Sequence, residues 1–243
     1  MLSIALPTLT LSETFDLTTK IYPLISLTTD MGSATIFTGG CNFRCPFCHN
    51  ASLVTEIDAD TFISEEEVLS FLSKRRGILD GVCITGGEPL LQKDITDFCK
   101  KVRALGLLIK LDTNGSRPDE LKALIEEGLV DYIAMDVKNS KELYATTCGI
   151  SDFPAEVERS IEIIMNSGLA YEFRTTVVKE LHTDTSIEAL CQWIAGAERY
   201  YLQGFIDSGD LIGNGFSAYS ADEMAELLEI AKKYIPSAEL RGI

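Results

Sequence analysis

The sequence predicts an α/β fold, a partial (open) TIM-type barrel of about six strand–helix units around a parallel sheet. Strand and helix patterns alternate along the 243 residues, several helical patterns end at a glycine, and polar glycine-rich segments follow the strands. Such alternation favours parallel strands joined by right-handed crossovers. Six units are fewer than the eight of a closed barrel, so an open doubly wound sheet is the alternative.

Strands are expected where β-branched and apolar residues run together, at residues 34–38, 81–85, 107–111, 130–135, 171–178, 199–203 and 238–240. Helices are expected where apolar residues recur at helical spacing, at residues 64–72, 95–105, 118–127, 154–166, 185–194 and 220–231. Ser64, Thr185 and Ser220 each stand three residues before a glutamate and are expected to cap helix N-termini. The stretch around Cys148 and Gly149 is expected to be irregular.

One domain covering residues 1–243 is the simplest organisation, because no linker or internal repeat is visible. It would consist of an N-terminal extension over 1–33, a barrel core over 34–205, and a C-terminal loop and helix over 206–243. The extension could supply an edge strand or hairpin. Hydrophobic residues make up 46% of the chain, which is sufficient for a large core.

The chain is acidic, with 21 basic and 37 acidic residues and a net charge of −16. Such a surface repels nucleic acid and anionic membranes, so neither is an expected partner. The odd number of cysteines and the absence of a basic signal-peptide segment indicate a reducing, cytoplasmic location. No apolar run approaches the ~20 residues that span a bilayer.

Three cysteines, Cys41, Cys45 and Cys48, follow the first expected core strand with C-x3-C-x2-C spacing. Clustered thiolates suit a soft metal centre. A four-iron cluster normally takes four cysteines, so three would leave one iron to bind another ligand. A zinc site is the alternative, although zinc usually takes four ligands and His49 is poorly placed beside Cys48. The other four cysteines, Cys83, Cys99, Cys148 and Cys191, are expected to be structural.

Further polar motifs follow other strands: Gly86-Gly-Glu-Pro89, Asp112-Thr-Asn-Gly115, Asp136-Val-Lys138 and Gln203. The carboxyl ends of parallel strands meet at one edge, so these motifs are expected to converge with the cysteines. Taken singly, the first two are ordinary turns, Asp136 and Lys138 a solvent-facing pair, and Arg174 a partner of any acid. Their shared edge favours one common site. His182 is expected in a polar surface loop.

The cysteine motif, with Phe47 before the third cysteine, resembles the signature of radical S-adenosylmethionine enzymes. His49, Asn50 and the Gly-Gly-Glu-Pro segment make the chain similar to glycyl-radical-enzyme activating enzymes. Residues 37–203 look most like activating proteins of anaerobic ribonucleoside-triphosphate reductase. The chain lacks the inserted ferredoxin-like domain of some such enzymes, and residues 29–33 depart from their usual Asp-x-Pro-Gly turn.

This resemblance implies a [4Fe-4S] cluster held by Cys41, Cys45 and Cys48, with S-adenosylmethionine chelated to the remaining iron. It implies that Lys138 pairs with the cofactor carboxylate and that Arg174 contacts the nucleoside. The wider cofactor-binding set comprises Phe47 near the adenine, His49, Asn50, Gly86, Gly87, Glu88 and Pro89 near the ammonium, Asp112, Asn114, Asp136 and Gln203. Asp112, Thr113 and the carbonyl of Ala134 match a monovalent-cation site.

The resemblance also implies an activity. One electron from a flavodoxin or ferredoxin-type donor would cleave S-adenosylmethionine, and the resulting 5′-deoxyadenosyl radical would take a hydrogen atom from a glycine of a partner glycyl-radical enzyme, with anaerobic ribonucleotide reductase the first candidate. One alternative is a radical enzyme with a small-molecule substrate, such as a deazapurine-forming type. That substrate would need polar groups inside the barrel, which the sequence does not locate. A non-catalytic zinc-binding or scaffold protein is the other alternative.

Overall fold

The structure is a computed structural model that describes residues 19–22, 32–55, 57 and 62–243. Its eight strands follow one another in the sheet in chain order, from β1 to β8. Within the described ranges, every helix is too short or too polar to cross a bilayer. Contacts divide the chain into two compact units. The first contains the described residues up to Cys41 with 52–113 and 119–133, and the second contains 42–51, 114–118 and 134–243.

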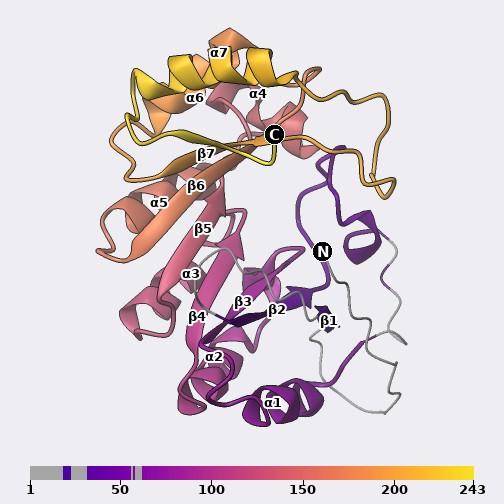
Figure 1. The fold of residues 1–243 in the computed structure, drawn as a ribbon, viewed down its shortest axis with the longest axis vertical. Coiled ribbons are helices and arrows are strands. Elements are labelled where there is room, and N and C mark those ends of the chain that lie inside the picture. Colours follow the sequence, from indigo (N-terminus) through magenta and orange to yellow (C-terminus); the bar gives the residue numbers. More distant parts are fainter. Residues whose placement is uncertain (1–18, 23–31, 56, 58–61) are drawn as a thin grey trace. The chain divides into compact units, whose positions relative to one another are not determined.

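The first unit is built on four strands: β1 (Thr19–Tyr22), β2 (Ser33–Thr38), β3 (Gly81–Gly86) and β4 (Leu108–Thr113). β1 runs antiparallel to β2, whereas β2, β3 and β4 are parallel neighbours. Its helices are α1 (Glu65–Ser73), α2 (Ile95–Ala104) and α3 (Pro118–Glu126), with the short 3-10 turn η3 (Pro89–Leu91). α1 packs against α2, and α2 packs against β4 (Figure 1).

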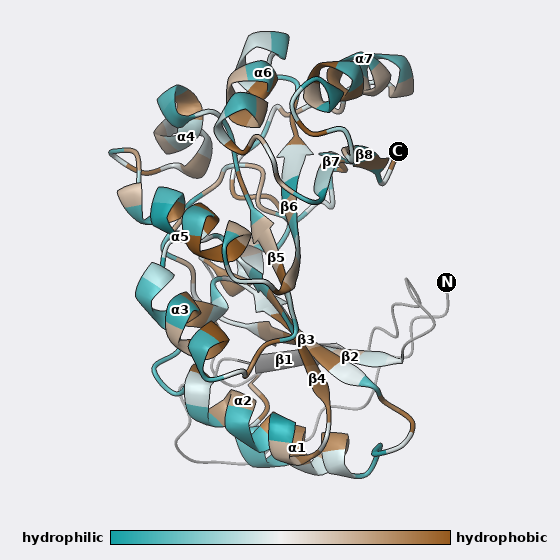
Figure 2. Cartoon of the chain, turned by 90° about the vertical axis from the view of Figure 1, so that its left-hand side faces the viewer, coloured by the Kyte–Doolittle hydropathy of each residue, from teal (hydrophilic) through white to brown (hydrophobic). Residues whose placement is uncertain are grey.

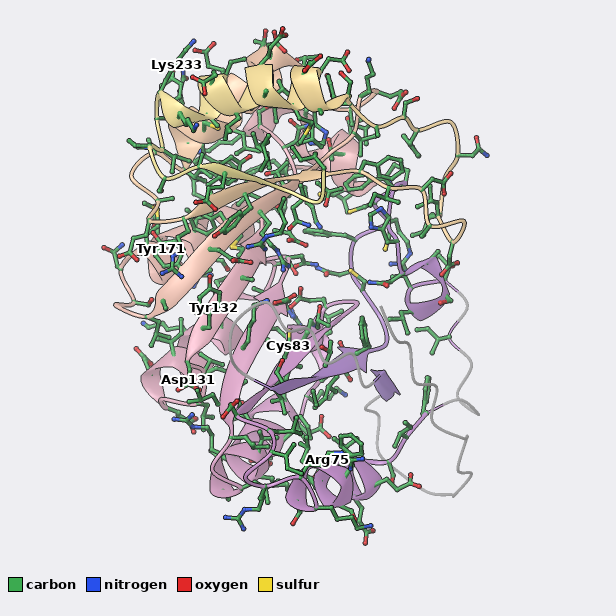
Figure 3. The ribbon with its side chains drawn as sticks, in the orientation of Figure 1. Arg75, Cys83, Asp131, Tyr132, Tyr171 and Lys233 are labelled. Carbon is green, nitrogen blue, oxygen red and sulfur yellow. The ribbon has the colours of Figure 1, made fainter. Side chains whose placement is uncertain are left out.

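Alternating burial explains the strands of this unit. Ile109, Leu111 and Thr113 of β4 are buried, while the residues between them are more exposed. The matching face of α2 buries Ile95, Phe98, Cys99 and Val102. Asp131, labelled in Figure 3, joins the two elements, since it accepts hydrogen bonds from Arg103 at 2.7 Å and from the Ile109 N–H at 2.8 Å.

The second unit contains the parallel strands β6 (Ala170–Val177), β7 (Tyr200–Gly204) and β8 (Glu239–Arg241). The strand β5 (Tyr132–Asp136) begins in the first unit and ends in the second, and the 3-10 turn η1 (Ala51–Leu53) also lies at the division. The helices are α4 (Lys141–Cys148), α5 (Ala155–Met165), α6 (Asp184–Trp193) and α7 (Ala221–Lys232). α6 packs against α4 and α7, and α7 against β7 and β8.

Amphipathic patterns explain these elements too. α5 and α7 carry hydrophobic and hydrophilic residues on different sides (Figure 2), and α7 buries Met224, Leu227 and Ala231. In β6, the buried residues Phe173, Thr175 and Val177 alternate with the half-buried Arg174 and Thr176. One side of β6 therefore joins the core, and the other carries Arg174.

The predicted α/β class is confirmed, and each of the seven predicted strands is present with slightly shifted bounds. The possible edge strand in the N-terminal extension is β1, while residues 29–31 of the departing turn lie outside the described residues. Ser64 and Ser220 form capping boxes, as predicted, with Glu67 and Glu223.

Two predictions about the secondary structure were wrong. The stretch before Gly149 is not irregular but forms α4, which ends at Gly149 in a left-handed conformation with φ of 63°. The N-cap of α6 is Thr183, not Thr185, because Thr183 and Ser186 exchange hydrogen bonds and start the helix earlier.

Candidate active site

In the first unit, the Gly86–Glu88 segment is hydrogen-bonded to the chain just before Cys41. The Gly87 N–H donates to the Thr38 carbonyl and the Glu88 N–H to the Gly40 carbonyl, each at 2.8 Å. A Cβ at Gly87 would stand 2.0 Å from the Gly40 oxygen. At Gly86, where φ is 116°, a Cβ would stand 2.5 Å from Thr38 backbone atoms. Both glycines are thus required by the chain's own backbone, in addition to any role toward a cofactor.

Glu88 supports this segment from inside. Its side chain is fully buried, and Oε1 accepts hydrogen bonds from the Leu90 N–H at 3.1 Å and from Thr113 Oγ1 at 2.8 Å. The former bond caps η3, whose first residue is the buried Pro89. Gln92 adds a donor to the Gly39 carbonyl at 2.9 Å. The structure therefore brings together Gly86–Pro89, Thr113 and the strand end that leads to Cys41.

Asp112 lies near the end of β4 and has partners within the first unit. Oδ1 accepts from Lys110 Nζ at 2.6 Å, and Oδ2 accepts from Thr85 Oγ1 at 3.3 Å. The thiol of Cys83, labelled in Figure 3, lies 3.7 Å from Oδ1. Lys110 already supplies a positive charge here. The monovalent-cation site of Asp112, Thr113 and Ala134 stays a prediction; Ala134 is buried in β5.

In the second unit, residues 42–50 form the cysteine loop. The Cys48 N–H donates to the Cys45 carbonyl at 3.0 Å and closes a turn around Pro46 and Phe47. The Arg44 N–H donates to the Cys148 carbonyl at 2.8 Å, and the Gly213 N–H donates to the Pro46 carbonyl at 2.7 Å. The end of α4 and the loop after β7 thus hold the backbone of the cysteine loop.

Asn114 of the Asp-Thr-Asn-Gly motif and the following Ser116 hold the start of the same loop. Asn114 Nδ2 donates to Asn42 Oδ1 at 3.1 Å, and Ser116 Oγ donates to the same oxygen at 3.2 Å. Asn114 Oδ1 in turn accepts the Ser116 N–H at 2.9 Å. Asn114, predicted as a member of the cofactor-binding set, therefore also positions the cysteine loop.

Aromatic residues pack around the end of the loop. Phe47 is buried, and His49 stacks on Phe205 with ring centroids 5.5 Å apart. Phe205 also meets Phe216 edge to face at 6.5 Å. Burial, together with the positive charge of Lys138, lowers the pKa of His49. The neutral imidazole is therefore favoured here.

Lys138 and Arg174 meet on one carboxylate. Asp136 accepts a hydrogen bond from Lys138 Nζ at 2.9 Å and another from Arg174 Nε at 2.8 Å. The two cationic side chains are only 16% and 13% exposed. Burial opposes ionisation of Asp136, but the two cations more than offset it and hold its pKa below the usual range. Burial also opposes the charge on Lys138, yet Asp136 and Cys45 raise the pKa of Lys138.

Further charged residues follow on β6 and β8. Arg174, Glu172 and Arg241 are called the charged row below. Arg174 Nη1 lies 3.9 Å from Glu172 Oε1. Arg241 donates to both Glu172 oxygens, at 2.9 and 3.0 Å, and its guanidinium lies 3.6 Å above the Tyr201 ring. Such bidentate, stacked geometry fixes an arginine in orientation as well as in charge. Gln203 lies on β7, where it is paired with Thr176 of β6 on one side and with Arg241 of β8 on the other.

The surroundings of the two thiols in the cysteine loop shift their pKa values in opposite directions. A hydrogen bond from Cys148 lowers the pKa of the Cys45 thiol against the effect of burial, and Lys138 acts in the same direction. Burial raises the pKa of Cys48, while the Asn50 backbone N–H and Lys138 oppose this rise. Among the described residues, no three His, Cys, Asp or Glu side chains are gathered around a common point. The three-cysteine set stays a prediction from spacing.

Sequence reasoning missed three residues near this site. His182 was expected at the surface, but it is fully buried and its Nε2 lies 2.8 Å from the Lys138 carbonyl oxygen. Asn139 and Cys148 are fully buried as well. Ser140 and Gly149 bracket α4 with typical helix-start and helix-end residues, and that signal could have placed Cys148 at the end of a helix.

Comparisons with known proteins agree on one family. The model of the radical SAM superfamily matches residues 35–194. A Methanocaldococcus jannaschii protein, provisionally named as a glycyl-radical enzyme activating enzyme, is 31% identical over 237 residues, which cover 94% of each chain. The 7-carboxy-7-deazaguanine synthase of Geobacter sulfurreducens is 29% identical over 84% of this chain and 83% of its own length.

A solved structure supports the fold. A domain of the pyruvate-formate lyase-activating enzyme from Bacteroides vulgatus superposes with a TM-score of 0.53 at 18% identity. The match covers 67% of the present chain and 99% of that domain. At this identity the likeness concerns the fold alone, and it agrees with the partial barrel predicted from sequence.

Proposed function

Because the chain belongs to the radical SAM superfamily, we propose that it activates a partner protein by removing a hydrogen atom from one of that protein's backbone glycines. The observation that carries this proposal is the 31% identity, over 94% of both chains, to a relative named for activation of glycyl-radical enzymes. The finer proposal for the partner is an anaerobic ribonucleotide reductase, because residues 37–203 resemble that group of activating proteins.

Enzymes of this superfamily use a [4Fe-4S] cluster and S-adenosylmethionine. We propose Cys41, Cys45 and Cys48 as the cluster ligands, from their spacing and from the lowered pKa of Cys45. When bound, the two groups together supply a 5′-deoxyadenosyl radical at the expense of one electron from a reductant. A flavodoxin or ferredoxin-type protein is the proposed electron donor.

The chain's own residues would bind and orient the cofactor. Lys138 is proposed to pair with its carboxylate and Arg174 to contact its nucleoside part, since both are fixed by Asp136. The Gly86–Pro89 segment is proposed to receive its ammonium group. The glycine Cα–H bond would then break, and its hydrogen atom would pass to the 5′ carbon, leaving the radical on the partner. The protein's share of this step is orientation and exclusion of water.

We further propose the cytoplasm as the location. None of the seven cysteines, all within the described part of the chain, forms a disulfide bond. Cysteines without disulfide bonds and a cluster of this kind both persist best in a reducing compartment.

The test combines anaerobically reconstituted protein, S-adenosylmethionine, a reductant and candidate glycyl-radical proteins, and records electron spin resonance. The proposal expects a glycyl radical signal on one partner, and no signal when that partner's glycine is replaced by alanine. Vigorous cofactor cleavage without a glycyl signal on any partner would count against it.

A second candidate function is radical chemistry on a small molecule. The similarity to a 7-carboxy-7-deazaguanine synthase favours it, and so does the charged row on β6 to β8. There the buried Glu172 holds Arg241 over Tyr201, which supplies polar groups of the kind a small substrate requires. Turnover of a metabolite without any partner protein, lost in Arg241→Gln, would favour this candidate.

A further inference from the structure

The chain just beyond β5 is held by side chains instead of a continuing strand ladder. The Val137 N–H still donates to the Arg174 carbonyl at 2.9 Å. The Val137 carbonyl then accepts from Thr175 Oγ1 at 2.7 Å, and the Lys138 carbonyl faces His182 Nε2 at 2.8 Å. His182 thus supplies the contact that fixes the main chain of Lys138.

The hydrogen bonds favour one tautomer of His182. A carbonyl oxygen can only accept, so Nε2 carries the proton that is donated to Lys138. Nδ1 lies 3.0 Å from the Val178 nitrogen, which can only donate, and 3.2 Å from the Val178 oxygen, which already accepts the His182 N–H at 2.9 Å, so Nδ1 is assigned as the acceptor. Burial lowers the pKa of His182, in keeping with this neutral form. Both ring nitrogens are engaged, and the Tyr219 hydroxyl donates to the His182 carbonyl at 2.6 Å.

The residue after Lys138 is fixed as firmly. Asn139 is fully buried and donates to Thr147 Oγ1 at 2.9 Å and to the Leu181 carbonyl at 2.8 Å. The loop at 178–182 is therefore hydrogen-bonded to two successive residues, Lys138 and Asn139. With its main chain fixed, Lys138 has only side-chain freedom left, and its pairing with Asp136 restricts that as well.

We propose that His182 is a positioning residue for S-adenosylmethionine binding: its Nε2–H holds the Lys138 carbonyl, and this presents the Lys138 ammonium to the cofactor's carboxylate. The inference rests on the proposed role of Lys138 but not on the identity of the substrate. If His182 only filled the core, its replacement would lower the stability of the fold without a specific effect on the affinity for S-adenosylmethionine.

Two variants separate these readings. In His182→Gln the side-chain amide nitrogen can reach the place of Nε2 and keep the donor to Lys138. In His182→Asn the amide reaches only the place of Nδ1, so the contact with Val178 can persist while the bond to Lys138 is lost. Both substitutions disturb the same buried position, so their effects on thermal unfolding should be similar.

The measurement is the dissociation constant of S-adenosylmethionine, determined anaerobically by equilibrium dialysis on the reconstituted holoenzyme. We expect it to rise about tenfold in His182→Asn and by no more than about threefold in His182→Gln, as loss of one buried hydrogen bond implies. Tyr219→Phe, which removes only the outer hydrogen bond, should leave the constant near its wild-type value.

A double variant tests the route through Lys138. In a Lys138→Ala background, His182→Asn should weaken binding no further. Equal dissociation constants for the Gln and Asn variants, or an additive loss in the double variant, would overturn the proposal. Loss of iron from His182→Asn would also overturn it, because His182 would then support the cysteine loop. No partner protein is present, so failure of glycine activation would leave these results unchanged.

Discussion

The N–H of Arg44 donates to the carbonyl oxygen of Cys148 at 2.8 Å, so that α4 ends directly against the cysteine loop. Gly149 follows in a left-handed conformation, and a Cβ there would stand 2.4 Å from the Arg44 oxygen. The thiol of Cys148 also hydrogen-bonds to Cys45. A helix whose sequence carries no recognised cofactor motif thus positions a proposed cluster ligand.

This contact predicts that Gly149→Ala destabilises the protein and reduces the iron bound after reconstitution. A left-handed alanine alone costs about 1–2 kcal/mol, and the clash with Arg44 adds to this cost. Gly128→Ala is the matched control, because φ is 64° there and a Cβ would meet nothing within 4 Å. Urea unfolding and iron analysis should show a larger loss at 149. Equal losses at both positions would mean that the contact with Arg44 has no effect.

Replacement of a proposed cluster ligand should separate metal binding from folding. Cys45→Ala should bind less iron and sulfide than wild type and cleave S-adenosylmethionine at least about a hundredfold more slowly, because second-shell changes alone already cost 10–100-fold. Cys99→Ala is the control: Cys99 is fully buried on α2, and burial raises its pKa to about 12. It should lose some stability but keep its cluster. Retained cleavage in Cys45→Ala would exclude this cysteine as a ligand.

The carboxylate of Asp136 should make stability depend on pH. Its pKa is lowered in the folded protein, because Arg174 and Lys138 outweigh the opposing effect of burial. Its contribution is therefore present above the unfolded pKa of about 3.9 and is lost as the pH falls toward the folded value.

Asp136→Asn should thus lower the free energy of unfolding by about 1–3 kcal/mol near neutral pH, since the two cations lose the carboxylate charge and one of its two acceptor oxygens. The difference from wild type should shrink as the pH falls from about 7 to below about 4. Urea titrations at several pH values provide the measurement. A difference that stays constant with pH would show that Asp136 is not the titrating group.

Capping of α7 provides a local stability test. The Glu223 N–H donates to Ser220 Oγ at 3.3 Å, and the Ser220 N–H donates to Glu223 Oε2 at 2.8 Å. Ser220→Ala should cost about 1 kcal/mol of unfolding free energy. Asp94→Ala is the control, because Asp94 precedes α2, is not buried and makes no side-chain cap hydrogen bond. It should cost about 0.5 kcal/mol or less, and a loss as large as that of Ser220→Ala would contradict the assigned capping role.

The periodic elements could be predicted from sequence because their burial follows one face. α2, for example, buries Ile95, Phe98, Cys99 and Val102 at helical spacing. α4 was missed because its buried residues, Tyr144, Thr147 and Cys148, include a threonine and a cysteine and give no continuous apolar face. The start of α6 was misplaced because two threonines compete for the cap, and only tertiary context selects Thr183.

The strand-end motifs of the candidate site could also be predicted, but not their partners. The sequence gives no signal that Glu88 meets Thr113 or that His182 meets the Lys138 carbonyl. Such hydrogen bonds join residues far apart in the chain and depend on how strands and loops pack. The glycines show the same limit. Gly86 and Gly87 were predicted to lie near the cofactor's ammonium group. The close approach of Thr38 and Gly40 backbone atoms to these glycines is visible only in the structure.

Transfer of a hydrogen atom from the partner's glycine tests the central claim most directly. The partner is produced with glycine deuterated at Cα and incubated anaerobically with the reconstituted enzyme, S-adenosylmethionine and reductant. Mass spectrometry of the 5′-deoxyadenosine should show one deuterium per molecule formed alongside each glycyl radical. 5′-Deoxyadenosine that contains no deuterium, in a reaction that nevertheless consumes S-adenosylmethionine, would contradict the account.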